Sequence, residues 1–430
     1  MSIYREVDLT LTAEHQQLKE AVHGFAKEVL RPAAVRLDRV CDPARAIAPD
    51  SELWETLRAA YRGGFHTGLI PAEHGGMGLS GLRLHIALEE LGWGSADFAA
   101  SLACTCFPFS SAAATGDRAL IDELVAPFVA DTSASMVGCW AITEPDHGSD
   151  HFLASTPQFH DARISGSVVA RASGDEYVVS GRKSRWVSNG TIATHAVVYL
   201  ALEPERGLAG GGVAIVPLDA PGVSKEPPLD KLGQRALNQG AIRFDGVRIP
   251  KRYVLVAADG YEAVLRQTLA LTNAAMGAIF TGVARAAYEE ALRWTRVRVQ
   301  GGRPLCEHQL VQKHLFDMFV KVENCRLLSR AACVYNDGSR PQALEYSVAS
   351  KVYCTQAAYE VADTAVQLFG GRGLSKDFLV EKLYRDARAS LVEDGSNDVL
   401  TLLGAQEVLR SAAPVQESLR IEWLETELVA

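Results

Sequence analysis

Apolar residues recur at intervals of three and four over the first third of the chain. Leu11, Leu18, Val22 and Phe25 would lie on one face of a helix at this spacing, and similar patterning runs from Leu9 to about residue 130. Further helices are predicted over 52–60, 82–91 and 99–114. The pattern therefore predicts an N-terminal helical domain over 1–134.

The pattern changes twice further along. Between residues 136 and 249, short runs rich in valine, isoleucine and aromatic residues are bounded by glycine, aspartate or proline, which is typical of strands. Strands are predicted over 177–180, 196–200, 213–217 and 241–244. Helical spacing then returns, and long stretches joined by short links predict an antiparallel bundle. These helices are expected over 261–299, 310–336, 341–368 and 378–410. The chain is thus predicted to be an α+β multidomain protein, with a small β-barrel-like domain over 135–252 and a helical bundle over 253–430.

Composition narrows the class of protein. Hydrophobic residues make up 48% of the 430 positions and charged residues 22%, the balance of a folded protein rather than a disordered one. The net charge is −9 and no block of lysines and arginines occurs, which argues against a nucleic-acid partner. No apolar run approaches the length of a membrane span, and the N-terminus resembles neither a secretory signal nor a transit peptide. We therefore expect no membrane insertion and a cytoplasmic location.

Metal and disulfide chemistry are not indicated. The eight cysteines are scattered along the chain, and the histidines do not cluster at ligand spacing. Neither a metal site nor a disulfide framework is predicted.

Two segments of the predicted β domain carry residue types that suit a cofactor. Residues 140–150 run into a turn rich in small hydrogen-bond donors, which suits a flavin edge or a phosphate but equally an ordinary strand and turn. Trp186 and Ser188 suit packing against a planar cofactor, although a tryptophan in a β domain is more often part of the core.

Two segments of the predicted bundle have similar potential. The glycines in 367–373 would let backbone approach a ligand closely, or they end a helix. Adjacent acids in 391–398 precede a Gly-Ser-Asn sequence that interrupts the helical pattern. A partly buried carboxylate there could act as a general base; the alternative is a solvated turn that caps the last helix.

In order and spacing, these four segments resemble the acyl-CoA dehydrogenase family over nearly the whole chain. The family pattern Thr-Glu-Pro-x-x-Gly-Ser-Asp is met without a gap by 143–150, and the Trp-x-Ser/Thr-Asn-Gly element by 186–190. Arg298, ahead of Gly302, resembles an element whose arginine reaches a flavin pyrophosphate across a subunit interface. The sequence Gln-Leu-Phe-Gly-Gly at 367–371 resembles the segment that receives the adenine end of FAD.

The resemblance implies a helical N-terminal domain, a central β domain and a C-terminal four-helix bundle that together bind FAD. It also implies a homotetramer, as a dimer of dimers, or a homodimer, because the FAD site in this family is shared between subunits. The expected cofactor-binding residues are Trp140, Ile142 and Thr143 along the flavin ring, Trp186 and Ser188 beside it, Ser149 near the pyrophosphate or the pantetheine, and Arg298, Gln367, Gly370, Gly371, Ser396 and Asp398.

The resemblance also indicates a catalytic base. Most members use the glutamate of a Tyr-Glu-Gly-Thr sequence, and this position is Asp394 here, preceded by Glu393 and followed by Gly395. Aspartate is one methylene shorter, and an offset of roughly 1 Å can cost on the order of 10²-fold in rate. Asp394 is preferred as the base because successive helical residues do not share a face, with Glu393 as the alternative.

The substrate-binding residues are expected around this base, and Ser149 and Gly395 are among them. Another branch of the family carries its base at a position matching Thr272, which cannot take this role. Asn273 stands where many members have an arginine that contacts the CoA arm, so a different acyl carrier is conceivable. The apolar run 102–109, which contains Phe107, is expected to wall the acyl pocket and favours a compact, branched or cyclic acyl group.

The reaction implied by the resemblance is α,β-dehydrogenation of an acyl-CoA or acyl-carrier thioester. Asp394 takes the α-proton, hydride passes from the β-carbon to N5 of the flavin, and an electron-transfer flavoprotein is the expected oxidant. Flavin oxidases of the nitroalkane-oxidase type also use an aspartate, but Thr401 stands where that group has an arginine. A non-catalytic flavoprotein relative is the third hypothesis.

Overall fold

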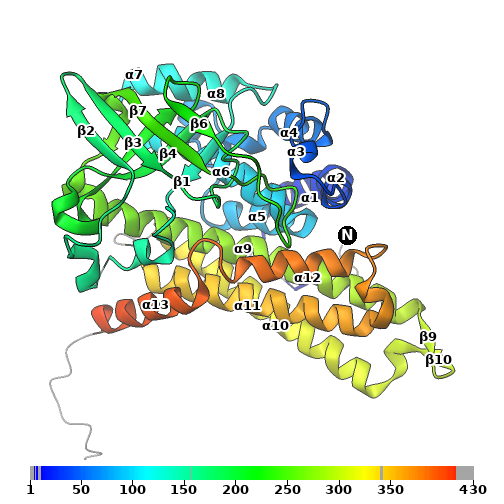
Figure 1. The fold of residues 1–430 in the computed structure, drawn as a ribbon. Coiled ribbons are helices and arrows are strands. Elements are labelled where there is room, and N and C mark those ends of the chain that lie inside the picture. The colour runs from blue at the N-terminus through cyan, green and yellow to red at the C-terminus, as the bar shows by residue number, and fades with distance from the viewer. Residues whose placement is uncertain (1–3, 5, 8–10, 155, 339–341, 413–430) are drawn as a thin grey trace, which may run out of the picture.

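Three units follow one another along the chain: a group of helices, a sheet, and a set of long helices (Figure 1). The computed structural model describes residues 4, 6–7, 11–154, 156–338 and 342–412. Helical N- and C-terminal units around a β unit confirm the predicted fold class. The helical starts expected at Leu9 and residue 341 lie outside the described residues, as do residues 413–430.

The N-terminal unit is a cluster of helices packed around one apolar core. Its helices are α1 (Ala13–Phe25), α2 (Arg31–Asp38), α3 (Pro43–Ala46), α4 (Glu52–Arg62), α5 (Gly81–Gly94), α6 (Ala96–Ala114), α7 (Arg118–Leu120) and α8 (Ala126–Ala130). Thr12 starts α1 with a capping box, and the Ser95 hydroxyl starts α6 by accepting from the N–H of Phe98. Most of α5 is buried, so this helix lies inside the molecule.

The central unit is an eight-stranded sheet with the order β6-β7-β3-β2-β4-β5-β8, in which β1 pairs in parallel with β4. The strands are β1 (Gly138–Ala141), β2 (Val169–Ser173), β3 (Glu176–Arg182), β4 (His195–Ala201), β5 (Gly211–Pro217), β6 (Val223–Lys225), β7 (Ile242–Pro250) and β8 (Val254–Val256). The four predicted strands correspond to β3, β4, β5 and β7. The predicted strands do not include β1, β2, β6 and β8. The pattern missed β2 and β6 because both expose most of their residues and lack an apolar run.

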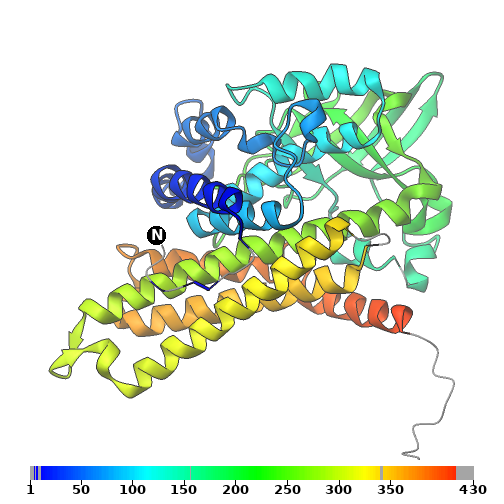
Figure 2. The same cartoon turned by 180° about the vertical axis from the view of Figure 1, so that it is seen from behind.

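Long helices of the C-terminal unit pack side by side beneath the other two units (Figures 1 and 2). They are α9 (Ala258–Val297), α10 (Gln309–Gly338), α11 (Leu344–Phe369) and α12 (Leu379–Ser390), followed by α13 (Asn397–Ser411); a short hairpin of β9 (Val299–Gln300) and β10 (Arg303–Pro304) joins α9 to α10. The interruption predicted within 378–410 is confirmed, because α12 ends at Ser390, α13 begins at Asn397, and Asp394 and Gly395 between them are left-handed.

The helix α9 crosses α5 at very short range. A Cβ atom on Gly92 would lie 2.1 Å from the carbonyl oxygen of Ile279, and one on Gly282 would lie 2.1 Å from that of Glu89. Only glycine permits this approach. Among the described residues, α9 is also the one helix long and apolar enough to span a membrane, but 89% of its apolar window is buried in the protein. Its apolar surface therefore belongs to the core.

Buried charges tie the same two helices together. Arg285 on α9 donates to Glu89 and to Glu90 on α5, each at 2.8 Å, and Arg326 on α10 donates to Glu89 at 3.0 Å.

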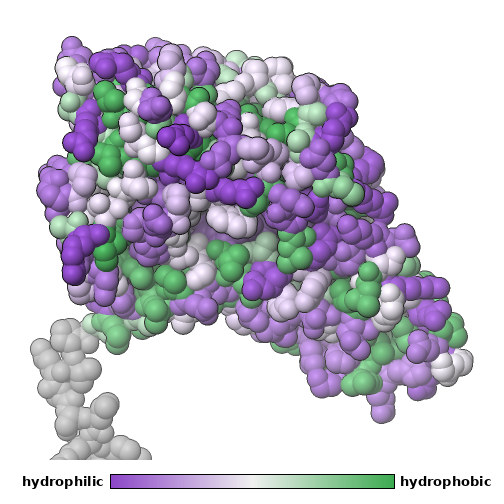
Figure 3. Space-filling model, in the orientation of Figure 1, coloured by the Kyte–Doolittle hydropathy of each residue, from purple (hydrophilic) through white to green (hydrophobic). Residues whose placement is uncertain are grey.

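The surface of the molecule is mostly polar. Polar residues cover most of the face in Figure 3, and apolar residues gather over α13, where Leu402 and Leu409 are exposed.

Candidate active site

The turn between α12 and α13 carries the two candidate bases. Asp394 has φ +52° and Gly395 has φ +93°, so two consecutive residues are left-handed. Aspartate tolerates this region better than most residues. The Ser396 hydroxyl then caps α13 by accepting from the N–H of Val399. The preference for Asp394 over Glu393 assumed a helix here, and that assumption is wrong; what separates the two acids is their partners.

Asp394 is hydrogen-bonded through one carboxylate oxygen only. Asn273 Nδ2, on α9, donates to Oδ2 at 3.0 Å and to the backbone oxygen of Asp394 at 3.3 Å. Oδ1 is buried and has no hydrogen-bond partner within the part of the chain that the structure describes. Burial raises the pKa of Asp394 above its ordinary value, and Lys351, Thr272 and Asn273 oppose this shift. Such a carboxylate suits proton abstraction.

Glu393 contacts a different unit. Gln234 Nε2, in the loop between β6 and β7, donates to Glu393 Oε2 at 2.6 Å. Burial raises the pKa of Glu393, and Lys231 is the strongest of the groups that lower it. Burial in turn lowers the pKa of Lys231 to about 8. Asp394 therefore contacts α9, whereas Glu393 contacts the β unit.

Lys351 is a residue of this site that the sequence patterns did not single out. It lies on α11 with no exposed surface, and its Nζ donates to the Gly395 oxygen at 2.6 Å and to Asn397 Oδ1 at 2.8 Å. The available signal was a lone cation in the otherwise apolar middle of a predicted helix. Burial of charge requires such partners.

An apolar cavity of about 50 Å³ lies between α5, α6 and α9. Leucines of α5 line it together with Leu102 and Phe107 of α6 and Leu271 and Thr272 of α9, and no charged residue contributes to its wall. Of the run 102–109, four residues line this cavity: Leu102, Ala103, Cys106 and Phe107. That it holds an acyl group stays a prediction. Thr272, which lines the cavity, also lies close enough to Asp394 to lower the pKa of that carboxyl, so one residue of the cavity wall neighbours the candidate base.

The two tryptophans predicted to contact a flavin lie in the β unit, and one of them packs against a residue that lines this cavity. Trp140, at the end of β1, packs edge to face against Phe107 with 5.6 Å between ring centroids. Its indole N–H is buried and has no acceptor among the described residues. Trp186 is 59% exposed, so the alternative of a core tryptophan is wrong. Ile142 is buried, and its carbonyl accepts from Lys183 Nζ at 2.9 Å.

Hydroxyl groups lie near both tryptophans in the sequence. Thr143 Oγ1 and Ser184 Oγ lie 2.6 Å apart, and Ser188 lies on the segment that follows. Ser149 Oγ accepts from the N–H of Ser396 at 2.9 Å, which joins the β unit to the turn that carries Asp394. An uncovered indole, an unpaired indole N–H and adjacent hydroxyls are a donor set that fits a planar, polar ring such as a flavin.

The other expected cofactor residues lie at the far end of the bundle. Arg298 directly follows α9, and Gln367, Gly370 and Gly371 are exposed at the end of α11, where Gly370 forms the C-cap. Stacking of Trp294 on Phe369, with 4.7 Å between centroids, holds these two helix ends together. About 25 residues of α9, or roughly 37 Å of helix, separate Asn273 from Arg298. Asp398 is exposed in the first turn of α13. One chain therefore presents two separate groups of predicted residues.

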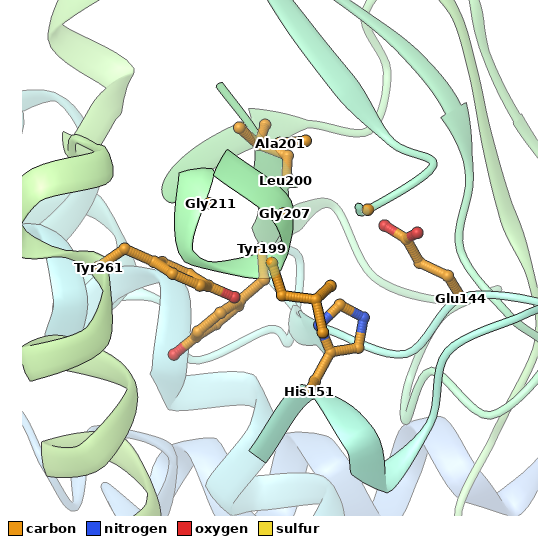
Figure 4. Close-up of a pocket in the computed structure, with 10 residues that line it drawn as sticks. Glu144, His151, Tyr199, Leu200, Ala201, Gly207, Gly211 and Tyr261 are labelled. Atoms are coloured by element: carbon orange, nitrogen blue, oxygen red, sulfur yellow. The ribbon is translucent and has the colours of Figure 1, made fainter. Parts of the chain in front are cut away.

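A second, smaller cavity lies in the β unit. Its volume of about 10 Å³ leaves room for about one water, so it cannot hold a substrate. Figure 4 shows Tyr261 on one side of it and Glu144 on the other, with His151 between. Burial lowers the pKa of His151 to about 4, so this imidazole is neutral at pH 7. Glu144 is an ion-pair partner of Lys183 at 2.8 Å, a structural role for the glutamate of the Thr-Glu-Pro motif.

Family models match each of the three units. The acyl-CoA dehydrogenase N-terminal domain matches residues 12–130, the middle domain 139–247 and the C-terminal domain 258–409. The chain belongs to the acyl-CoA dehydrogenase family, and it is an oxidoreductase of the class that acts on CH–CH bonds through flavin-dependent acyl-CoA dehydrogenation.

Individual relatives cover nearly the full chain. Human mitochondrial short-chain specific acyl-CoA dehydrogenase is 30% identical over 417 residues, 95% of this chain and 93% of the relative. Cyclohexane-1-carbonyl-CoA dehydrogenase of Geobacter metallireducens is 30% identical over 399 residues, 92% and 97% of the two chains. Among solved structures, the glutaryl-coenzyme A dehydrogenase glutaryl-CoA complex superposes with a TM-score of 0.82 at 26% identity, covering 94% of this chain and 98% of that one.

Proposed function

We propose that this protein dehydrogenates a compact, apolar acyl thioester at its α and β carbons, with Asp394 as the base and FAD as the cofactor. The observation that carries the proposal is the Asp394 carboxylate, whose Oδ1 has no partner among the described residues and whose neighbour Thr272 lines an apolar cavity. Asn273 fixes the other oxygen, so the free one is the atom that would receive the α-proton.

The surroundings of Asp394 suit this role. Removing water around a carboxylate raises its pKa, which strengthens it as a base toward a weakly acidic C–H. Polarisation of the thioester carbonyl by the N–H of Asp394 would acidify that C–H, in the manner of an oxyanion hole. Glu393 is the poorer candidate because Gln234 holds it toward the β unit.

Family members are FAD-dependent, and the residues of this chain fit a flavin. Trp140, Thr143, Trp186 and Ser188 would contact the ring through the exposed indole face, the free indole N–H and the hydroxyl groups. When bound, FAD supplies a hydride acceptor at N5, which no amino-acid side chain can replace.

The cavity supports a compact acyl group without charge. Its walls are aliphatic and aromatic, so a carboxylate or ammonium on the acyl chain would be buried without a partner. The relative named cyclohexane-1-carbonyl-CoA dehydrogenase agrees with a small cyclic or branched substrate. CoA is the proposed carrier; Asn273 is engaged with Asp394, so contacts to the carrier must come from other residues.

We further propose that each flavin site uses two copies of the chain. Arg298 and the exposed end of α11 lie too far from Asp394 to serve the same flavin within one subunit. Phe316, Val320 and Leu327 of α10 expose large apolar surface at spacings of four and seven residues, as expected of a helix that packs against another copy. A dimer of dimers would bury this surface.

An electron-transferring flavoprotein is the proposed oxidant. A chain from a structural study of the electron-transferring flavoprotein of Acidaminococcus fermentans has a similar fold, with a TM-score of 0.81 at 25% identity.

The test is an anaerobic titration of the purified, FAD-loaded protein with a panel of straight, branched and cyclic acyl-CoAs, followed by flavin absorbance. Bleaching by small branched or cyclic thioesters, with formation of the enoyl product, is the expected result. Reduction only by long straight chains would refute the substrate class. A flavin that no thioester reduces, but that a nitroalkane reduces, would refute the reaction.

A further inference from the structure

Lys351 is an unusual buried lysine. Two other lysines with almost no exposed surface form direct ion pairs: Lys183 with Glu144 at 2.8 Å, and Lys382 with Asp97 at 3.1 Å. Lys351 instead donates to a backbone carbonyl and a side-chain amide, and no carboxylate lies within ion-pair distance of it in the described part of the chain. Burying an ammonium group without a paired charge is costly, so its place in α11 calls for a reason.

The acceptors of Lys351 belong to the turn that carries Asp394. Nζ donates to the oxygen of Gly395, the residue after Asp394, and to Asn397 Oδ1 at the start of α13. The Thr355 hydroxyl, one turn along α11, receives a bond from Asn397 Nδ2 at 3.0 Å. Hydrogen bonds from one face of α11 therefore hold the turn on the C-terminal side of the base.

This turn needs external support. The left-handed conformation of Asp394 is unfavourable for a residue with a Cβ and persists only when its surroundings impose it. Asn273 supports the turn from α9, the Ser149 hydroxyl supports it from the β unit by accepting from Ser396, and Lys351 supports it from beneath. Of these three, only Lys351 brings a charge.

We propose that Lys351 is a positioning residue for the catalytic base: its bonds to Gly395 and Asn397 hold the left-handed turn that carries Asp394. The inference rests on the proposed role of Asp394. Lys351 itself touches neither the cavity nor the surface assigned to the flavin, so it acts through the turn.

The charge has a definite effect on pH dependence. Burial raises the pKa of Asp394, and Lys351 is the strongest of the groups that lower it. The other titratable neighbours are Glu393 on the same turn, Cys104 on α6 and Tyr199 on β4, and burial raises the pKa of each of the three. None of them supplies a positive charge. Burial lowers the pKa of Lys351 itself to about 8, so its charge acts on Asp394 at pH values below that. Without Lys351, the base would stay protonated, and therefore inactive, up to a higher pH.

The experiment compares Lys351→Met, which removes bonds and charge, with Lys351→Gln, which keeps a donor without charge. Lys313→Met, at an exposed lysine of α10, is the matched control. Each FAD-loaded variant is assayed for the rate of flavin reduction between pH 5.5 and 9. Backbone hydrogen exchange of 391–397 is measured by mass spectrometry, which reports on the turn without turnover.

The expected results separate the effect of the hydrogen bonds of Lys351 from the effect of its charge. Lys351→Met should slow reduction on the order of 10²-fold, accelerate exchange in the turn and move the pH profile upward. Lys351→Gln should move the pH profile upward with a smaller loss of rate, and it also serves if the methionine variant does not fold. Wild-type rates and an unchanged pH profile in either variant would overturn the proposal, and so would slow reduction with unchanged exchange and pH profile. Wild-type reduction by Asp394→Asn would instead show that the assignment of the base is wrong.

Discussion

Replacing Asp394 with asparagine tests the proposed base with little change in shape. The two side chains are nearly isosteric, and the amide oxygen of asparagine can still accept the bond from Asn273 that Oδ2 accepts in the wild type. What disappears is the carboxylate oxygen that has no hydrogen-bond partner among the described residues. The substitution therefore separates the chemistry of the base from its position.

The magnitude follows from what a positioned base contributes. General-base catalysis typically supplies about 10²–10⁴-fold, or about 2.7–5.5 kcal/mol of barrier at 1.36 kcal/mol per factor of ten. Flavin reduction by a reactive thioester should fall by this factor. Thioester affinity should change little, because the cavity wall is untouched.

The same substitution should increase the stability of the folded protein at neutral pH, although it lowers the rate of flavin reduction. Burial raises the pKa of Asp394 in the folded protein, so ionising this group opposes folding. An acid with a raised folded pKa loses its stabilising contribution as the pH rises through that value, whereas asparagine does not ionise. The stability advantage of the variant should be smallest near pH 3, where aspartate is largely protonated in both states, and should grow as the pH rises to 8.

Two measurements test whether Asp394 is the base and whether burial raises its pKa. Stopped-flow absorbance under anaerobic conditions gives the rate of flavin reduction, and thermal unfolding at several pH values gives the difference in stability. Reduction within tenfold of the wild type would refute Asp394 as the base. A stability difference that does not grow with pH would refute the conclusion that burial holds the pKa of Asp394 up.

Three further experiments test the role of the cavity, the contribution of the buried charges to stability, and the sharing of the site between two copies of the chain. Ala103→Leu enlarges a side chain of the cavity wall and so reduces the space for an acyl group. It should lower kcat/KM for the largest accepted thioester by about 10- to 200-fold and change kcat/KM for smaller thioesters little. An equal loss for all substrates would contradict the assignment of the cavity as the acyl pocket. Arg285→Met removes the buried guanidinium shared by Glu89 and Glu90, while Arg326 still bonds Glu89, and it should cost about 3–5 kcal/mol of stability in urea titrations. The exposed Arg163→Met should leave the stability nearly unchanged, and equal costs would contradict the importance of the buried network. Co-expressed Arg298→Glu and Asp394→Asn chains should regain activity that neither variant has alone, because one site of a mixed dimer is intact; no recovery would argue against a site shared between copies.

Much of the site could be located from the sequence because its residues come in short contiguous motifs. The turn at 391–398, the donor-rich segment at 143–150 and the glycines at 370–371 each combine residue types whose backbone preferences are local. The structure shows the ordinary roles beside the proposed ones: Ser396 is an N-cap and Gly370 a C-cap. Local chemistry of this kind needs no knowledge of the rest of the chain.

The burial of single residues was less accessible. A tryptophan in a β unit is usually part of the core, yet Trp186, four residues after the end of β3, is 59% exposed. Lys351 is the converse, a charged residue inside a helix with no exposed surface. Periodicity reports which face of an element is apolar, but not which single position meets a polar group from another element.

By itself, then, the sequence determined the order of the three units, their long helices, half of the strands of the main sheet and the family, and it predicted the position of the candidate base, because all of these depend on periodicity and on contiguous motifs. Only the tertiary structure decided that Asn273 and Lys351 bond the turn of Asp394 from two different helices, that Thr272 beside this turn lines a cavity without charged residues, and that Arg298 at the end of α9 lies far from Asn273. These facts are distances between segments up to hundreds of residues apart, and such distances are set by how helices and sheet pack rather than by any local preference of the chain.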